Sequence, residues 1–206
     1  MPKDTFLNLP QDRRDLIINA SIEEFARNPF ENASLRKIVA ITAIAKGSMY
    51  QYFKDKKELY IYVLNLAYER KRQYVASAFF TKRGDFFELV KEYYVQTYRF
   101  AQEHPLLHSV IHNFWESRDS AVREEILKER SVRISDFEEV LSQGMASGQI
   151  REGIDYEATY FVYHAVGKEL IENFLHDSTL QDQNVDFIAR VLGIIKHGIV
   201  AHKPSK

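Results

Sequence analysis

The sequence lacks cysteine altogether and has one tryptophan, five prolines and eight glycines among its 206 residues. Without cysteine there can be no disulfide and no thiolate metal site, which agrees with a reducing compartment. No run approaches the roughly 18 uninterrupted apolar residues of a membrane span, and "MPKDTFLNLPQDRR" has no apolar signal segment. These absences predict a soluble, cytoplasmic protein with no membrane partner.

Charge is nearly balanced over the chain, with a formal net charge of −1. It is not evenly distributed, because residues 36–57 hold six basic side chains and one acidic one, Asp55. Two interpretations of this run are open. It is either a solvated helix face, which is the usual meaning of such a run, or an electrostatic footprint for phosphate.

Hydrophobic periodicity close to 3.6 residues recurs along the chain, and no strand-like alternation bounded by turns appears. The pattern predicts an all-α protein of about nine helices. Asp55 and Glu58 form a variant of the capping box at the start of the fourth helix. The expected helices cover residues 11–27, 35–41, 45–53, 55–78, 85–103, 105–115, 120–147, 155–176 and 184–201.

Residues 35–41 and 45–53 are two short helices joined by a turn of about three residues, Thr42-Ala43-Ile44, and a supporting helix precedes them. This arrangement is a helix-turn-helix pattern. The second helix of such a unit can lie in the major groove of DNA, with its N-terminal residues against base edges.

Gly47 lies near the start of that second helix, where glycine costs about 1 kcal/mol of helix propensity relative to alanine. A residue without a side chain lets another backbone approach, and the N–H groups of Lys46–Ser48 can meet a phosphate. The alternative is that Gly47 is an ordinary loop glycine and that Tyr50 and Tyr52 are half-buried aromatics without a ligand.

The block from Ile17 to Tyr60 resembles the DNA-binding domain of TetR/AcrR-family repressors, and "KGSMYQYFKDKKEL" (46–59) carries the strongest match. Ile17, Ala20, Phe25 and "SLRKI" (34–38) also match. The resemblance implies a helix-turn-helix DNA-binding domain, residues 1–54, and a larger helical domain for ligand binding and dimerisation, residues 55–206.

Three positions depart from the family pattern. Pro29 and Ala43 stand where glycine is usual, and Ala45 stands where a capping serine is usual. If the backbone at position 43 needs a positive φ, Ala43 is strained. The missing cap at Ala45 costs roughly 1 kcal/mol of helix stability. Ala45 is therefore not counted among the expected DNA contacts.

Transferred residue by residue, the resemblance implies two sets of DNA contacts, in addition to the close approach at Gly47. Arginine or lysine on guanine and glutamine on adenine are natural pairings. Base-edge contact is implied for Arg36, Lys46, Ser48 and Gln51, and phosphate contact for Ser34, Tyr50, Tyr52 and Lys56.

The last two expected helices suggest a four-helix interface with a second copy. Helix 155–176 is apolar nearly all round between Tyr160 and Leu175, and helix 184–201 has well-spaced apolar residues. The resemblance also implies dimerisation there, and a two-fold dimer would bind a pseudo-palindrome. The alternative is that both helices close the core of one monomer. The residues expected at the interface are Tyr163, Val166, Leu170, Ile188, Val191, Leu192 and Ile195.

Aromatic residues crowd the middle of the chain, and most of them should be core. The resemblance implies an effector pocket among these helices, which an apolar or aromatic small molecule would suit. The residues taken as candidates for its wall are Tyr94, Tyr98, His112, Trp115 and Phe137.

These observations predict a homodimeric, ligand-responsive transcriptional regulator of double-stranded DNA, in the form of a repressor released by its effector. We expect no cofactor and no metal, although His108 and His112 lie four residues apart. An all-α enzyme is the first rival, but no paired-carboxylate or nucleophile–base signature supports it. The second rival is a DNA-bound regulator whose output is contact with another protein.

Overall fold

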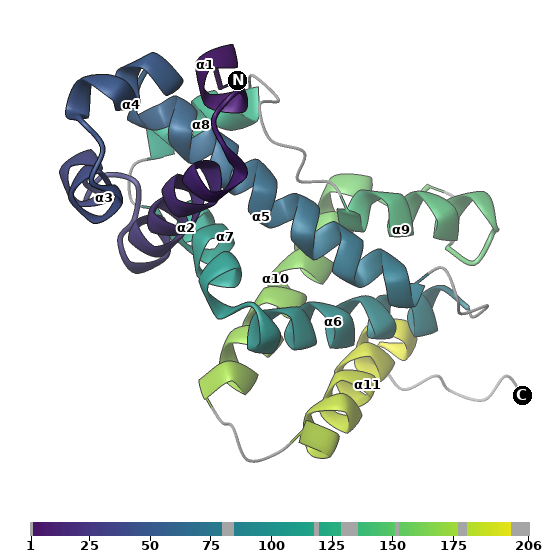
Figure 1. Cartoon of the computed structure of the whole chain (residues 1–206). Coiled ribbons are helices and arrows are strands. Elements are labelled where there is room, and N and C mark those ends of the chain that lie inside the picture. Colours follow the sequence, from purple (N-terminus) through teal and green to yellow (C-terminus); the bar gives the residue numbers. More distant parts are fainter. Residues whose placement is uncertain are drawn as a thin grey trace, which may run out of the picture. The chain divides into compact units, whose positions relative to one another are not determined.

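The computed structural model describes residues 2–79, 85–117, 120–128, 136–150, 153–176 and 181–198. All regular structure in these ranges is helical, which confirms the all-α prediction (Figure 1). The helices are α1 (Asp4–Leu7), α2 (Gln11–Arg27), α3 (Leu35–Thr42), α4 (Lys46–Tyr52), α5 (Lys56–Phe79), α6 (Phe86–Glu103), α7 (Pro105–Glu116), α8 (Ser120–Lys128), α9 (Asp136–Ala146), α10 (Tyr156–His176) and α11 (Gln181–His197). None of the helices in these described ranges is long and apolar enough to cross a bilayer.

The described residues contain eleven helices, two more than the nine that periodicity predicts. The helix α1 was missed, because a four-residue helix is too short to show a 3.6-residue pattern. The range 120–147, expected as one helix, contains both α8 and α9, and residues 129–135 between them lie outside the described part.

Packing divides the chain into two compact units. Unit 1 consists of residues 1–71 and 104–134, and unit 2 of residues 72–103 and 135–206. Helix α5 contributes residues to both. The limits of these two units differ from the predicted boundary between a DNA-binding and a ligand-binding domain after residue 54. That functional boundary stays a prediction.

In unit 1, α7 packs along α2. The Asn113 side chain of α7 donates hydrogen bonds from Nδ2 to the carbonyl oxygens of Phe25 (3.0 Å) and Ala26 (2.9 Å), at the C-terminal end of α2. These contacts satisfy carbonyls that a helix end leaves unpaired. Buried apolar side chains from α2, α3, α4, α5 and α7 fill this unit, among them Ile17, Phe25, Ile38, Met49, Phe53, Leu59, Val63, Val110 and Phe114.

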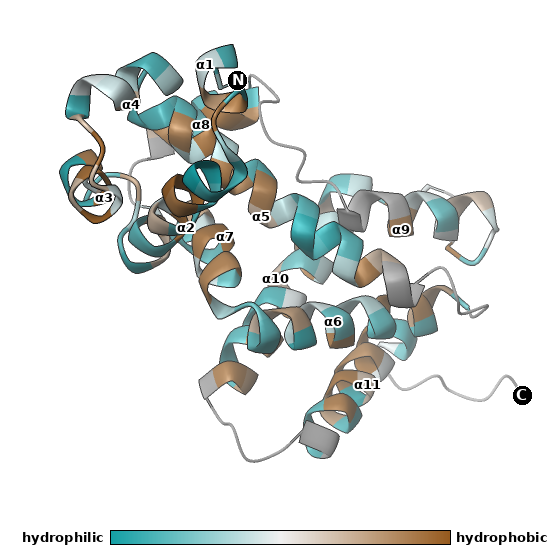
Figure 2. Cartoon of the chain, viewed as in Figure 1, coloured by the Kyte–Doolittle hydropathy of each residue, from teal (hydrophilic) through white to brown (hydrophobic). Residues whose placement is uncertain are grey.

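In unit 2, α6 packs against α9, α10 and α11. Both α6 and α11 carry hydrophobic and hydrophilic residues, as Figure 2 shows. The ring of Tyr94 lies so close to α10 that a Cβ at Gly167 would come within 2.6 Å of it. Glycine at position 167 is therefore what permits this approach of α6 to α10.

The turn between α3 and α4 contains the strained alanine that the sequence suggests. Ala43 has φ 50° and ψ 31°, in the left-handed region, and among the described residues no other non-glycine has a positive φ. A left-handed conformation costs an L-residue about 1–2 kcal/mol.

Replacing Ala43 with glycine is expected to raise the free energy of unfolding by about 0.5–1 kcal/mol, because glycine adopts positive φ without strain. The matched control is Ala40→Gly, at an exposed position inside α3. There the same change should lower stability by about 1 kcal/mol. Urea unfolding followed by circular dichroism measures both. Equal destabilisation by the two substitutions would contradict the assigned strain.

Candidate nucleic-acid interface

Helices α3 and α4 form a compact helix-turn-helix with one buried and one exposed side. Ile38, Met49 and Phe53 point inward and are at most 1% exposed. Thr42, the last residue of α3, is also buried, and its hydroxyl donates to the carbonyl of Ile38 over 2.8 Å. Because the inward residues take one face of α4, the opposite face is left to solvent.

The nine residues predicted to contact DNA lie together on this part of unit 1. Arg36, Lys46, Gly47, Tyr50 and Gln51 are exposed, and the remaining four are half-buried. These four are Ser34, Ser48, Tyr52 and Lys56. All nine residues lie in the segment 34–56 and none of them is buried, although contact with DNA stays a prediction.

Gly47 faces open space. A Cβ built at this position would meet no atom of the protein within 4 Å. The protein's own packing therefore does not require glycine there. The intrinsic cost of glycine in a helix is left without an internal explanation, which favours a role toward something outside the chain.

The N-terminal end of α4 is only weakly capped. Ala45 occupies the N-cap position and makes no side-chain hydrogen bond to the helix, while the Ser48 N–H reaches the Ala45 carbonyl over 2.9 Å. Ser34 is the N-cap residue of α3, but its side chain makes no capping hydrogen bond either.

The contact that fixes the start of α3 comes from a residue that the sequence analysis missed, Glu24. This carboxylate is 6% exposed, and its Oε1 accepts the Ser34 N–H over 2.8 Å. The Lys37 ammonium lies 3.7 Å from the same oxygen. The available signal was the position of Glu24, seven residues after Ile17 and four after Ala20, which places it on the buried side of α2.

Lys56, for which phosphate contact stays a prediction, makes contacts within unit 1. Its Nζ donates hydrogen bonds to the carbonyl oxygens of Phe30 (2.6 Å), Ala33 (3.1 Å) and Glu31 (3.4 Å), and lies 4.4 Å from the centre of the Phe30 ring. Burial lowers the pKa of Lys56, although the nearby carboxylates of Glu31 and Glu24 raise it. A phosphate would have to replace these carbonyls, so the structure indicates a role in holding the loop before α3.

The aromatic residues expected around an effector are divided between the two units. Tyr94 and Tyr98 are core residues of unit 2, where the Tyr94 hydroxyl donates to the Tyr163 carbonyl over 2.5 Å. His112 and Trp115 belong to unit 1, where Trp115 Nε1 donates to the Tyr68 hydroxyl over 2.9 Å. The Phe137 side chain lies outside the described residues.

A cavity of about 660 Å³ opens within unit 2, at the beginning of α6. Its wall is mainly apolar and comes from α6, the connection between α9 and α10, α10 and α11. Of the predicted pocket residues, the four whose side chains are described, Tyr94, Tyr98, His112 and Trp115, do not line it. The lining residues are Phe86, Phe87, Gln149, Ile150, Ile154, Asp155, Ala158, Thr159, Val162, Tyr163, Ile195 and Lys196.

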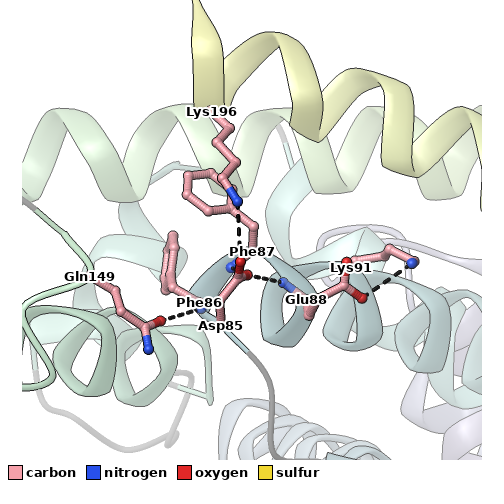
Figure 3. A network of polar contacts seen from close by, with 7 residues as sticks. All are labelled: Asp85, Phe86, Phe87, Glu88, Lys91, Gln149 and Lys196. Atoms are coloured by element: carbon pink, nitrogen blue, oxygen red, sulfur yellow. Dashed lines mark hydrogen bonds and ion pairs between the residues drawn. The ribbon is translucent and has the colours of Figure 1, made fainter.

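Polar contacts join three segments beside this cavity (Figure 3). Asp85 accepts the N–H groups of Phe87 and Glu88 at the start of α6 and pairs with Lys196 Nζ of α11 over 3.1 Å. The Glu88 N–H and Lys196 together hold the pKa of Asp85 below its usual value. Gln149 Oε1 accepts the Phe86 N–H. Fixed polar groups thus border an apolar space, as is typical of small-molecule sites.

The residues expected at the dimer interface fall mostly on the inner side of α10 and α11. Four of the seven are buried in the core of unit 2, and the other three are partly buried. The buried four are Tyr163, Leu170, Ile188 and Leu192, and the partly buried three are Val166, Val191 and Ile195. Large apolar side chains are exposed elsewhere on the same helices: Phe161 (70%), Ile194 (57%), Val162 (44%) and Phe187 (42%).

No group of three or more potential metal ligands gathers within the described ranges. The rings of His108 and His112 lie side by side on α7, with centroids 6.3 Å apart.

The helix-turn-helix segment matches a family model. Residues 17–63 fit the model described as "Bacterial regulatory proteins, tetR family". Over 200 residues the chain is 26% identical to the fatty acid metabolism regulator protein of Bacillus subtilis, covering 89% of this chain and 93% of that protein.

Solved structures agree with the fold. A TetR family transcriptional regulator from Chloroflexus aurantiacus superposes with a TM-score of 0.72 and 25% identity, over 98% of this chain and 100% of that one. The regulator FadR from Bacillus subtilis, solved in complex with stearoyl-CoA, superposes with a TM-score of 0.65 and 21% identity, over 90% of this chain and 99% of that one.

Proposed function

We propose that this chain, which belongs to the TetR family of transcriptional regulators, is a homodimeric repressor that an apolar effector releases from a pseudo-palindromic operator. The observation that carries the proposal is the exposed polar face of α4, which stands opposite the buried Met49 and Phe53. A helix held in this way can enter a major groove with its exposed residues against the bases.

Roles follow from chemistry and exposure. Arg36, Lys46 and Gln51 have the side chains that form bidentate pairs with guanine or adenine, and all three are exposed. Ser48 is the fourth proposed base contact. Tyr50, which is 45% exposed, offers its hydroxyl to phosphate. Ser34 and Tyr52 are assigned to phosphate as well, and the open space at Gly47 admits the DNA backbone.

Gln51→Ala is expected to change base preference, because the side chain that would pair with adenine is removed. Tyr50→Phe should instead weaken binding to all duplexes by about tenfold, because one hydrogen bond to a charged group is lost. The measurement is selection of duplexes from a randomised library, followed by affinity at several salt concentrations.

The matched control is Gln143→Ala, at an exposed position on α9 of unit 2. This control should select the same duplexes as the wild-type protein. The base-reading role fails if Gln51→Ala selects that same set too. The DNA-binding proposal itself fails if the wild-type protein retains no duplex at low salt.

Dimerisation through the outward faces of α10 and α11 is the second part of the proposal. Phe161 and Ile194 are the most exposed large apolar side chains of these helices. Apolar side chains exposed at adjoining helices are typical of interfaces between copies of a chain. We therefore assign the interface to this outward set, and the buried members of the predicted set support the helices from inside.

The double substitution Phe161→Glu with Ile194→Glu is expected to yield a monomer, because four carboxylates would have to be buried at each two-fold interface. Loss of the second half-site should lower DNA affinity by about 10²-fold or more. Analytical ultracentrifugation and duplex binding measure the two effects. Leu106→Glu, at a position 45% exposed on α7, is the control and should stay dimeric. A dimeric double variant would contradict this interface.

A long-chain acyl thioester is the effector class that we propose, with stearoyl-CoA as the first probe. The relative named as a fatty acid metabolism regulator is 26% identical along nearly its whole length, and stearoyl-CoA is the ligand named with the FadR structure. The cavity at the start of α6 supports the proposal, because its apolar wall suits an acyl chain. Helix α5, which is continuous from Lys56 to Phe79, would carry the change to α4.

Stearoyl-CoA is expected to release the wild-type protein from a selected duplex, and Ala158→Phe should weaken this response by about tenfold or more. Ala158 lines the cavity and is exposed, so a larger side chain fills the space without disturbing the core. Ala158→Ser is the size control and should respond as the wild type. Fluorescence anisotropy of the duplex measures release. Equal release from all three proteins would place the acyl site elsewhere.

A further inference from the structure

The C-terminal end of α4 is capped by residues far away in the sequence, at the beginning of the chain. Lys3 Nζ donates to the carbonyl of Tyr50 over 2.8 Å, and Thr5 Oγ1 donates to that of Gln51 over 2.5 Å. The Lys3 N–H donates to the carbonyl of Tyr52 over 3.0 Å. Since the Phe53 N–H reaches the Met49 carbonyl over 2.9 Å, all of the last four carbonyls of α4 have a donor.

This N-terminal segment is itself firmly anchored. The Phe6 side chain is 0% exposed, and its ring centroid lies 4.8 Å from that of Phe53 and 6.1 Å from that of Tyr52. From the other side, Arg14 of α2 donates to the Leu7 carbonyl over 3.1 Å. The donors at Lys3 and Thr5 are therefore held in place by a buried aromatic contact.

Helix α4 depends on such support for physical reasons. It has only seven residues and contains Gly47, and its N-cap residue, Ala45, makes no side-chain capping hydrogen bond. Helices of this length are marginal on propensity alone. A lysine ammonium at the C-terminal end also meets the negative end of the helix dipole. The N-terminal segment thus caps the C-terminal end of α4, whereas its N-terminal end has no side-chain cap.

We infer that Lys3 and Thr5 are positioning residues of the DNA-reading helix, and this inference rests on the proposed function. The two parts of Gln51 are used differently. Its side chain is exposed toward the proposed base edges, while its carbonyl is held by Thr5. Loss of these hydrogen bonds leaves the base-contacting side chains intact but makes the backbone that positions them more mobile. We therefore expect a larger loss of sequence specificity than of general affinity for DNA.

The test uses the full chain with Thr5→Val, Lys3→Met and the double variant. Thr5→Ser and Lys3→Arg are the conservative controls, because each keeps the donor. The first measurement is hydrogen exchange of the peptide that covers residues 46–53. We expect exchange about fivefold faster in the double variant, and exchange unchanged in the two controls.

The second measurement is the ratio of affinities for a duplex selected by the wild-type protein and a scrambled duplex of equal length. This ratio is expected to fall about fivefold to tenfold in the double variant and to be preserved by Thr5→Ser with Lys3→Arg. A smaller folded fraction would lower both affinities equally and leave the ratio unchanged. An unchanged ratio therefore overturns the inference.

A phosphate contact by Lys3 gives another pattern. It would lower both affinities and the salt dependence of binding by about one ion, with no change in exchange of α4, and this result would also overturn the inference. The proposed function fails separately, if the wild-type protein selects no duplex at all. In that case the positioning role falls with it, whatever the exchange rates are.

Discussion

Burial of Met49 and Phe53 is the interaction on which the reading surface depends. Met49 lies within α4 and Phe53 directly follows it, and both side chains are at most 1% exposed. Because a helix turns about 100° per residue, fixing Met49 also fixes the outward direction of Lys46, Tyr50 and Gln51. The helix is too short to be stable by itself. Its geometry is therefore a property of unit 1 as a whole.

Some charged side chains in unit 1 form hydrogen bonds with backbone groups of the protein. Lys56 donates to three carbonyls of the loop before α3, and Glu24 accepts the Ser34 N–H at the start of that helix. A local excess of positive charge therefore overstates what is free to meet phosphate. Lys3 also binds the backbone, because its N–H and its ammonium both donate to carbonyl oxygens of α4.

Two aromatic core residues of unit 2, Phe86 and Tyr163, line its cavity, whereas Tyr94 and Tyr98 do not. The rings of Tyr94 and Tyr98 pack inside, whereas the cavity lies at the start of α6, beside Asp85 and Lys196. Periodicity identifies aromatic residues that share a helix face, but it does not tell a filled interior from an open one. That distinction depends on how closely helices approach, and the contact between Tyr94 and Gly167 is one example.

From the sequence alone, the long helices, the helix-turn-helix and the Asp55–Glu58 start of α5 were predictable, because these features are encoded by neighbours within a few residues. The strain at Ala43 was predictable for the same reason. Tertiary structure alone decided that Lys56 turns toward a loop and that Lys3 and Thr5 cap α4. It also decided that Leu170 and Ile188 are core while Phe161 is exposed. Local patterns say which residues share a face, but only the packed chain determines what covers that face.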